Sequence, residues 1–179
     1  MLKQRDLHEC HALFNLMTDP AVFPYVRYPC QSYEKYLFIT KQLIVEEEQG
    51  TCISRTILDE IGQPIGTIDL YHIHHRTGFL ATWIGAPYFG KGYNQRAKEA
   101  FLAELFLGQD IETIFLKIRT QNIRSKRAVE KLPYVKLANE RYEQVYQSIN
   151  RSQQRYDLYG VERSDFLESS GGIRHGVAT

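Results

Sequence analysis

A glycine-rich segment is the part of the chain whose residue types best fit a chemical role. It reads Gly85-Ala-Pro-Tyr-Phe-Gly-Lys-Gly92 and precedes a stretch with helical spacing of apolar residues. The first backbone N–H groups of a helix have no partner within the helix, and the helix dipole favours an anion there. Gly90 and Gly92 let the backbone approach a bulky phosphate, and Lys91 adds positive charge. The pattern indicates a phosphate-binding loop, although a plain glycine-rich turn explains the loop by itself equally well.

Two familiar nucleotide-binding motifs are excluded at this loop. No Gly-Lys-Ser/Thr follows four residues after a first glycine, so the loop is not a Walker loop. Gln95 stands where the third glycine of a dinucleotide-binding Gly-x-Gly-x-x-Gly would lie. The loop alone therefore does not name its ligand.

A histidine cluster raises the question of a metal site. His72, His74 and His75 lie close together in the sequence. Strand alternation would put His72 and His74 on one face, which is compatible with metal binding. No cysteine or carboxylate partner accompanies them. We therefore favour histidines at the surface or at the end of a hairpin, and we expect no metal.

The composition indicates one globular domain. The chain has 179 residues, 43% of them hydrophobic, and a formal net charge of +1 with well-mixed signs. Nothing marks a surface for nucleic acid or for an anionic membrane. No apolar run is long enough to span a bilayer, and the N-terminus lacks the hydrophobic region of a signal peptide. Cys10, Cys30 and Cys52 are widely spaced, which favours reduced thiols in a cytoplasmic protein.

The first third of the chain predicts two helices joined by a loop. A helix is expected from Asp6, which can cap it, to Thr18-Asp-Pro20. Prolines and aromatics without a period predict an ordered loop over 21–31. A second helix is expected over 32–48, with Ser32 as its cap.

After residue 50 the pattern changes to alternating strands and helices. Strands are expected over 52–58, 65–73, 80–84, 111–119, 134–146 and 156–162, and helices over 92–107 and 123–132. This order predicts an α/β fold with a mixed sheet, antiparallel hairpins first and a βαβα crossover in the middle. We expect a single domain over 1–166. The residues after Phe166 have loop composition, so 167–179 are expected to form a flexible tail.

Three sequence blocks stand in a fixed order along this pattern, and a fourth segment precedes them. The blocks are Trp-Ile-Gly-Ala-Pro-Tyr-Phe-Gly-Lys-Gly-Tyr at 83–93 with Lys-Glu-Ala at 98–100, Asn-Ile-Arg-Ser at 122–125 with its continuation to Leu132 and Tyr134, and Arg-Tyr-Asp-Leu-Tyr at 155–159; the preceding segment is Gly-Thr-Ile-Asp-Leu at 66–70. With these blocks the chain resembles the GCN5-related N-acetyltransferase (GNAT) family, and in particular the branch that acetylates the N-terminal alanine or serine of ribosomal proteins. The resemblance implies a mixed, mostly antiparallel twisted sheet, flanked by helices, whose two central parallel strands splay apart.

The resemblance implies acetyl-CoA as the cofactor and assigns residues to it. The cofactor's arm would pair with strands 80–85 and 114–119, and the N–H of Trp83 or Ile84 would face the thioester oxygen. Asn122 would contact a pantetheine amide, and Arg127 or Lys126 the adenosine phosphates. The pyrophosphate would be held by the N–H groups of Phe89, Gly90, Lys91, Gly92, Tyr93 and Asn94.

Proton transfer is assigned less firmly. The branch places a hydroxyl beside the cofactor sulfur at Ser125, where it would protonate the leaving thiolate; a first-turn or capping serine is the alternative. A general base is needed most for a lysine amine, whose pKa is about 10.4 against about 8 for an N-terminal amine. The acidic residue often found before the loop is missing from 79–82. Glu143, on the strand expected over 134–146, is the candidate base, with a solvated strand carboxylate or a relaying water as alternatives.

These assignments predict an acetyl-CoA-dependent N-acetyltransferase in which a primary amine attacks the thioester directly. The acceptor is left open between a protein N-terminus and a small amine. Aromatic residues of the 21–33 segment would either line the acceptor groove or pack the loop onto the core: Phe23, Tyr25, Tyr28 and Tyr33. A homodimer through a sheet edge or through the C-terminal strands is also left open. The alternative function is a non-catalytic CoA-binding or protein-interaction module, motivated by the missing carboxylate before the loop and by the departures from the family pattern at Pro87 and Pro133.

Overall fold

The computed structural model describes residues 1–174, with side chains described as far as residue 170. A seven-stranded sheet runs through it in the order β1-β2-β3-β4-β5-β7-β6. The chain forms two compact units. The first contains Met1–His74 and Leu80–Gln109, and the second contains His75–Phe79 and the chain from Asp110 onward. The α/β class and the mostly antiparallel mixed sheet are thus confirmed.

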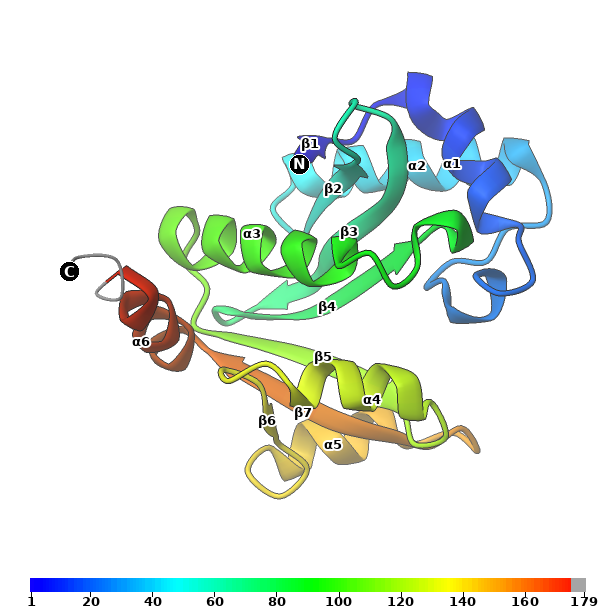
Figure 1. The fold of residues 1–179 in the computed structure, drawn as a ribbon. Helices are drawn as coiled ribbons and strands as arrows, with labels where there is room; N and C mark the ends of the chain where they lie inside the picture. Colours follow the sequence, from blue (N-terminus) through cyan, green and yellow to red (C-terminus); the bar gives the residue numbers. More distant parts are fainter. Residues whose placement is uncertain (175–179) are drawn as a thin grey trace. The chain divides into compact units, whose positions relative to one another are not determined.

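The first unit is built on β1 (Leu2–Gln4), β2 (Cys52–Leu58), β3 (Pro64–His74) and the end of β4 (Thr77–Ile84). The first three strands pair antiparallel. Nearly every residue of β2, and most of β3, is buried, so both faces of this sheet must be covered. Helices α1 (Cys10–Met17) and α2 (Tyr33–Glu48) cover one face and α3 (Tyr93–Gly108) covers the other, as Figure 1 shows.

Caps fix where the first helices begin. Asp6 accepts a hydrogen bond from the His8 N–H at 2.9 Å, at the start of a short 3₁₀ turn that leads into α1. Ser32 accepts from the Lys35 N–H at 3.3 Å and caps α2. Each cap satisfies a backbone donor that the helix leaves unpaired. Both caps were predicted from the sequence.

The contact between β3 and β4 depends on a glycine. A Cβ added at Gly66 would lie well under 3.0 Å from the Trp83 carbonyl oxygen. The Gly85 N–H donates to the Ile65 carbonyl at 2.8 Å, so the two backbones remain in register to the end of β4. Only glycine allows this approach.

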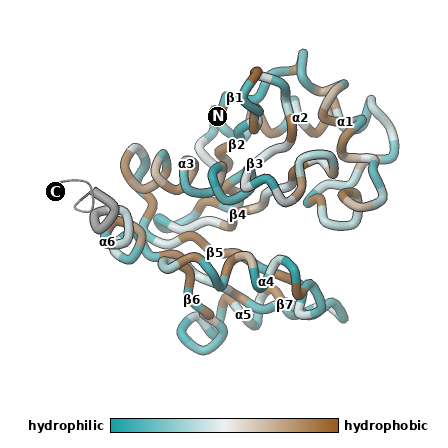
Figure 2. Tube along the Cα trace, viewed as in Figure 1, coloured by the Kyte–Doolittle hydropathy of each residue, from teal (hydrophilic) through white to brown (hydrophobic). Residues whose placement is uncertain are grey.

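The second unit is built on β5 (Thr113–Arg119), β7 (Tyr156–Glu162) and the short β6 (Lys136–Leu137). Both β5 and β6 pair antiparallel with β7, and the first three residues of β4 pair parallel with the start of β5. Figure 2 shows β5 as a largely hydrophobic strand. Its faces are covered by α4 (Ile123–Glu130), whose Glu130 accepts from the Tyr159 hydroxyl at 2.8 Å, and by α5 (Glu143–Ile149).

The strand expected over 134–146 is wrong. Only Lys136–Leu137 form a strand there, and Glu143–Ile149 form α5. Four apolar side chains recur at helical spacing and pack against Phe115 and Leu158: Tyr142, Val145, Tyr146 and Ile149. Burying this stripe favours the helix over a strand.

The loop expected after Phe166 is also wrong as far as residue 174, because Arg163–Arg174 form α6. The Phe166 ring packs edge-on against Tyr134 with centroids 5.1 Å apart. Asp165, in the first turn, lies 2.8 Å from the Lys136 amine. These contacts anchor a segment whose composition is poor for a helix. Residues 175–179 of the expected tail lie outside the described residues. Within the described part of the chain, no helix combines the length and apolar character needed to cross a membrane.

Candidate active site

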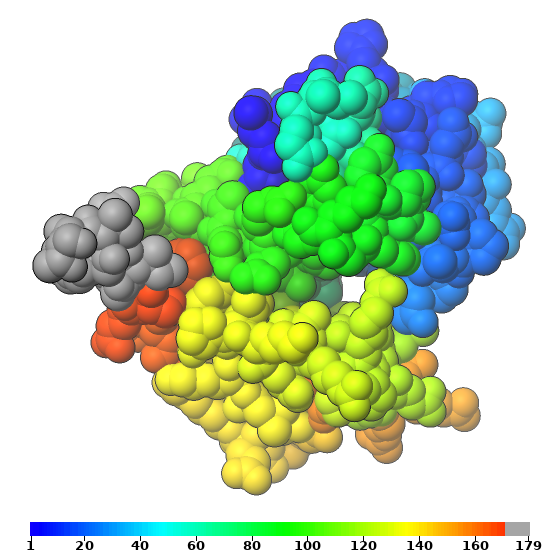
Figure 3. Space-filling model, viewed as in Figure 1, coloured from blue at the N-terminus to red at the C-terminus, as the bar shows by residue number. Residues whose placement is uncertain are grey.

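The glycine-rich loop has the backbone geometry of an anion-binding turn. Gly90 and Gly92 have φ values of +71° and +78°, in the left-handed region that favours glycine. Gly92 is the N-cap of α3 and provides no side chain to cap it. The loop and the first turn of α3, green in Figure 3, lie at the surface. The N–H groups of six predicted residues are thereby gathered in one segment: Phe89, Gly90, Lys91, Gly92, Tyr93 and Asn94.

Side chains around the loop hold its shape. The Arg96 guanidinium donates to the Lys91 carbonyl at 3.2 Å and stacks 4.7 Å from the Tyr93 ring centroid. The Tyr93 hydroxyl donates to Glu60, and this hydrogen bond raises the pKa of Tyr93 to about 12. The Tyr93 side chain is therefore a support for the loop, and its backbone N–H remains the group directed at an anion.

The end of β4 presents its backbone in two directions. The Trp83 carbonyl lies against Gly66 and the Gly85 N–H donates to β3, so these two residues face β3. The N–H and C=O of one strand residue point to the same edge, and successive residues alternate. The Ile84 N–H therefore points away from β3, whereas the Trp83 N–H points toward it.

A cavity of about 40 Å³ lies beside this strand end, within the first unit. That is room for a few water molecules or a small polar head group. Thr82 and Trp83 of β4 form one wall and Asp69 of β3 another. Tyr36 and Thr40 of α2, Arg5, and the loop between α1 and α2 complete the lining.

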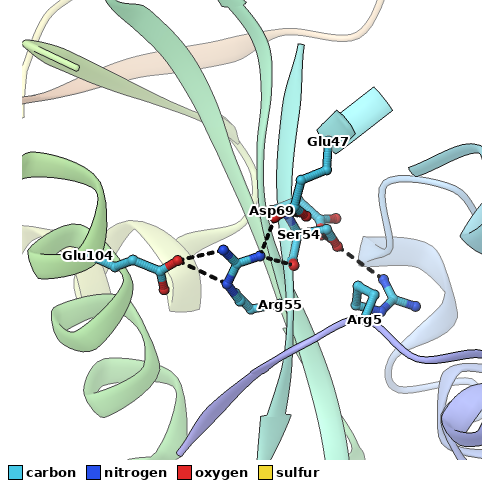
Figure 4. Close-up of polar contacts among 6 residues, drawn as sticks. All are labelled: Arg5, Glu47, Ser54, Arg55, Asp69 and Glu104. Carbon is cyan, nitrogen blue, oxygen red and sulfur yellow. Dashed lines mark hydrogen bonds and ion pairs between the residues drawn. The ribbon is translucent and has the colours of Figure 1, made fainter. Parts of the chain in front are cut away.

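Asp69 is the carboxylate that sequence reasoning missed. It is 6% exposed and pairs across the strands with Ser54, whose hydroxyl donates to Asp69 Oδ1 at 2.5 Å (Figure 4). Burial raises the pKa of Asp69, against the opposing effects of Arg5 and of the Ser54 hydrogen bond. The sequence-based prediction of the base considered 79–82, where the carboxylate is missing, and Glu143, but not this strand. The available signal was a lone aspartate within an otherwise apolar strand, Ile-Gly-Thr-Ile-Asp-Leu at 65–70.

Two arginines flank this carboxylate. The Arg5 guanidinium donates to the Ser54 hydroxyl at 3.2 Å and to the Tyr36 and Thr40 hydroxyls at 3.3 Å each. The Arg27 guanidinium is stacked 3.5 Å from the Tyr71 ring centroid. Through residue 170, the Arg5 Nε and Arg27 Nη1 are buried with no hydrogen-bond partner, and so is the Thr82 Oγ1. The cavity is therefore lined by polar groups that the protein leaves unsatisfied.

The aromatic residues of the 21–33 segment lie in two different environments. Tyr25 and Tyr28 line the cavity. Phe23 and Tyr33 pack against the buried cluster around Leu13, Met17 and Trp83.

A second charged network, centred on Arg55, links β2 to the helices α2 and α3. Arg55 on β2 donates to Glu47 of α2 at 2.7 Å and to Glu104 of α3 at 2.6 and 2.9 Å (Figure 4). Glu47 also accepts from the Ser54 backbone N–H at 3.1 Å. The position of Ser54, and through it Asp69, thus depends on α2.

The second unit brings Asn122 and Ser125 together. The Asn122 Oδ1 accepts from the Ser125 N–H at 3.2 Å, so Asn122 caps α4 and Ser125 is a first-turn residue. Lys126 lies 2.7 Å from Asp157, and this hydrogen bond raises the pKa of Lys126. Arg127 is exposed. Of the two cations predicted to hold adenosine phosphates, Arg127 is thus the one that no carboxylate engages among the described residues.

Glu143 does not lie on a strand. It is exposed in the first turn of α5 and accepts from the Gln147 amide at 3.0 Å. The strand register that made it a candidate base is therefore wrong.

The histidine cluster lies at the end of β3: His74 is the strand's last residue, His72 lies two residues before it, and His75 begins the turn to β4. His72 and His75 have positive φ values, and His72 contacts Tyr71 edge-on at 4.9 Å. Across the described chain, no three histidine, cysteine, aspartate or glutamate residues are grouped as a metal would require.

Comparison with known proteins bears on these features. The sequence matches the family described as acetyltransferase (GNAT) domain over residues 1–135. The chain belongs to the GNAT acetyltransferase family. No curated protein sequence matches it significantly. As a GNAT protein it is an N-acetyltransferase and its cofactor is acetyl-CoA. The uncapped start of α3 and the two glycines with positive φ fit a pyrophosphate.

Solved structures share the GNAT fold at low sequence identity. The chain is similar to FdhC, a nucleotide-linked sugar GNAT, with a TM-score of 0.77 and 13% identity over 99% of this chain and 94% of that one. It is also similar to the spermidine N-acetyltransferase from Vibrio cholerae in complex with CoA and spermine, with a TM-score of 0.74 and 14% identity over 93% and 97%. A chimera of the Vibrio cholerae enzyme SpeG and hSSAT gives 0.72 and 18% over 93% and 97%.

Proposed function

We propose that the protein transfers the acetyl group of acetyl-CoA to a primary amine that enters the cavity at Asp69. The observation that carries this proposal is a buried carboxylate in a cavity whose wall includes Thr82 and Trp83, directly before the glycine-rich loop. The amine nitrogen forms the new bond to the acetyl carbon, and the carbon–sulfur bond of the thioester breaks.

Backbone groups of the first unit bind the cofactor in this proposal. The N–H groups from Phe89 to Asn94 hold the pyrophosphate, with Lys91 adding charge. The Ile84 N–H is favoured over that of Trp83 as the donor to the thioester oxygen, because it points away from β3.

Side chains of the second unit are assigned to the remaining cofactor contacts. Asn122 contacts a pantetheine amide through its amide nitrogen, because its oxygen caps α4. Arg127 pairs with the adenosine phosphates. The Ser125 hydroxyl gives a proton to the leaving thiolate.

Asp69 replaces Glu143 as the proposed general base. Burial raises the pKa of Asp69, which makes its ionised form a stronger base than an ordinary carboxylate. It takes a proton from the entering ammonium group, so that the neutral amine can attack.

The test compares Asp69→Asn with the wild-type enzyme and with Glu48→Gln, a control at an exposed position of α2. Thiol release from acetyl-CoA is measured with amino acids, alkylamines, polyamines and short peptides as acceptors. We expect Asp69→Asn to lower kcat by about 100-fold or more and to leave the thermal shift caused by acetyl-CoA unchanged. A kcat equal to that of wild type would reject Asp69 as the base.

The alternative of a non-catalytic CoA-binding module makes a different prediction. In that case acetyl-CoA raises the Tm of the wild-type protein, yet no acceptor in the panel produces thiol release.

The cellular setting is part of the same proposal. The three cysteines are free and buried, which supports a reducing compartment such as the cytoplasm. That residues 1–166 act as a single acetyltransferase domain is still a prediction. So is a homodimer formed through a sheet edge. Size-exclusion chromatography with light scattering measures the oligomeric state.

A further inference from the structure

The charge lining the Asp69 cavity is unusual for a site that receives an ammonium group. Two guanidinium groups, of Arg5 and Arg27, line the cavity together with one carboxylate, Asp69. Over the described residues, neither arginine has a carboxylate within 4.0 Å. By contrast, Arg55 of the same unit pairs with Glu47 and Glu104. The lining is thus positive overall.

The contacts of these two arginines do not neutralise the excess positive charge of the cavity lining. Arg5 donates only to neutral hydroxyl groups, of Ser54, Tyr36 and Thr40. Arg27 is held by stacking on Tyr28 and Tyr71, with ring centroids at 4.4 and 3.5 Å. Each guanidinium retains one buried nitrogen without an acceptor within the described chain. Both side chains are only partly buried, but an enclosed guanidinium nitrogen without an acceptor is costly, because it has lost its hydrogen bond to water.

A polyamine does not fit this lining. Each additional ammonium group would need a carboxylate, and the one carboxylate present already accepts from Ser54 and lies in the field of both arginines. A group with acceptor oxygens and a negative charge would instead satisfy the guanidinium nitrogens. A carboxylate is small enough for a cavity of about 40 Å³ and is planar, as guanidinium recognition favours.

We infer that the acceptor is a primary amine that also carries a carboxylate. This inference rests on the proposed function, because it identifies which amines that site accepts. The ammonium group lies toward Asp69 and Thr82, and the carboxylate lies toward Arg27 and Arg5. Arg27 and Arg5 are then specificity residues, and the spacing between the two charged groups of the acceptor sets which amine reacts.

Trp83 allows the inference to be tested by binding, independently of turnover. It is the only tryptophan in the chain and it lines the cavity. Its fluorescence is titrated with ω-amino acids from glycine to 6-aminohexanoate and with the alkylamines of matching length, with acetyl-CoA replaced by CoA. We expect at least one amino acid to bind about tenfold or more tightly than its matched amine.

The variants assign that preference to the cavity. Arg27→Gln and Arg5→Gln should each reduce the preference to within about threefold, and Arg27→Lys should restore part of it. Arg151→Gln, at an exposed position of the second unit, is the matched control and should keep the preference. Amines or spermidine that bind as tightly as every amino acid, a preference that survives both glutamine variants, or no binding by any amino acid would each overturn the inference.

Turnover separates this inference from the proposed function. Thiol release with alkylamines or spermidine but not with amino acids would keep the acetyltransferase and overturn the carboxylate requirement. Tight binding of an amino acid without thiol release from any acceptor would support the recognition and overturn the proposed transfer to a cavity-bound amine.

Discussion

Replacing Lys98 with methionine should stabilise the protein at neutral pH. Lys98 lies on α3, is 9% exposed, and has no carboxylate within 4.0 Å among the described residues. Burial lowers its pKa from 10.5 to about 8. A difference of about 2.5 pH units multiplied by 1.36 kcal/mol gives a cost of about 3 kcal/mol for the charged amine in the folded state. Methionine has a similar length and no charge, so it removes that cost.

The sign of the pH dependence follows from the lowered pKa. Between about pH 8 and 10.5 the unfolded state binds the Lys98 proton and the folded state has released it. The free energy of unfolding of wild type therefore rises with pH through this window, and the contribution is lost as pH falls toward 8. Below pH 8 both states are protonated and the full cost of about 3 kcal/mol applies. Lys98→Met should be more stable than wild type at pH 7, with a difference that shrinks toward pH 10.5.

Urea unfolding followed by circular dichroism at pH 7, 8, 9 and 10 measures this difference. Lys41→Met, at an exposed position of α2, controls for the removal of a lysine that is hydrated in both states. A Lys98→Met protein with the same unfolding free energy as wild type at pH 7, and the same slope above pH 8, would refute the reasoning.

Three further predictions concern the cavity, the loop and the charged network. Because the pKa of Asp69 is raised, its contribution to the free energy of unfolding is fully present below about pH 4 and is lost as pH rises through the pKa of the folded state. Asp69→Asn should therefore abolish this decline in urea titrations. An unchanged pH profile would count against a buried, protonatable Asp69. Gly92→Ala, at φ +78°, and its control Gly50→Ala, at φ +74° in open space, should each lower the free energy of unfolding by about 1 kcal/mol. Only Gly92→Ala should also reduce the thermal shift caused by acetyl-CoA. Equal thermal shifts in the two variants would show that the loop does not bind the cofactor. Arg55→Met should lower the free energy of unfolding by about 2 kcal/mol or more, because it leaves Glu47 and Glu104 without their cation. Arg76→Met should lower it by under about 1 kcal/mol, since the ion pairs of Arg76 are exposed. Similar urea midpoints for the two variants would contradict this ranking.

Local patterns determined much of the fold. The strands Cys52–Leu58 and Tyr156–Glu162 have the predicted bounds, and α2 has the predicted cap. These segments combine a clear period with strong end signals, so local and tertiary preferences agree. The stretch around Glu143 differs because its aromatic residues suit a strand by propensity, while the tertiary contacts with Phe115 and Leu158 favour a helix. In α6 the anchoring contacts of Phe166 and Asp165 outweigh a run of serine and glycine.

The geometry of the candidate site follows from the sequence where it depends on the backbone, but not where it depends on buried side chains. The glycine-rich loop is readable because positive φ requires glycine. Asp69 and Lys98 interrupt apolar patterns, and periodicity treats a polar residue as solvent-facing. On α3, the apolar Ala100 is exposed and the charged Lys98 is buried. Whether a polar side chain is buried depends on the helices and strands packed around it, so the periodicity of one helix or strand does not predict it.

The close approach of β3 to β4 makes the distance between these strands independent of the side chains that line the cavity. At Gly66 the distance between the strands is fixed by backbone against backbone, so no side chain there can be exchanged to adjust it. The cavity beside it is walled by side chains at positions 5, 27, 36 and 82. Directed evolution of the acceptor range should therefore accumulate changes at those four positions, while position 66 remains glycine under every selection that requires acetyl transfer.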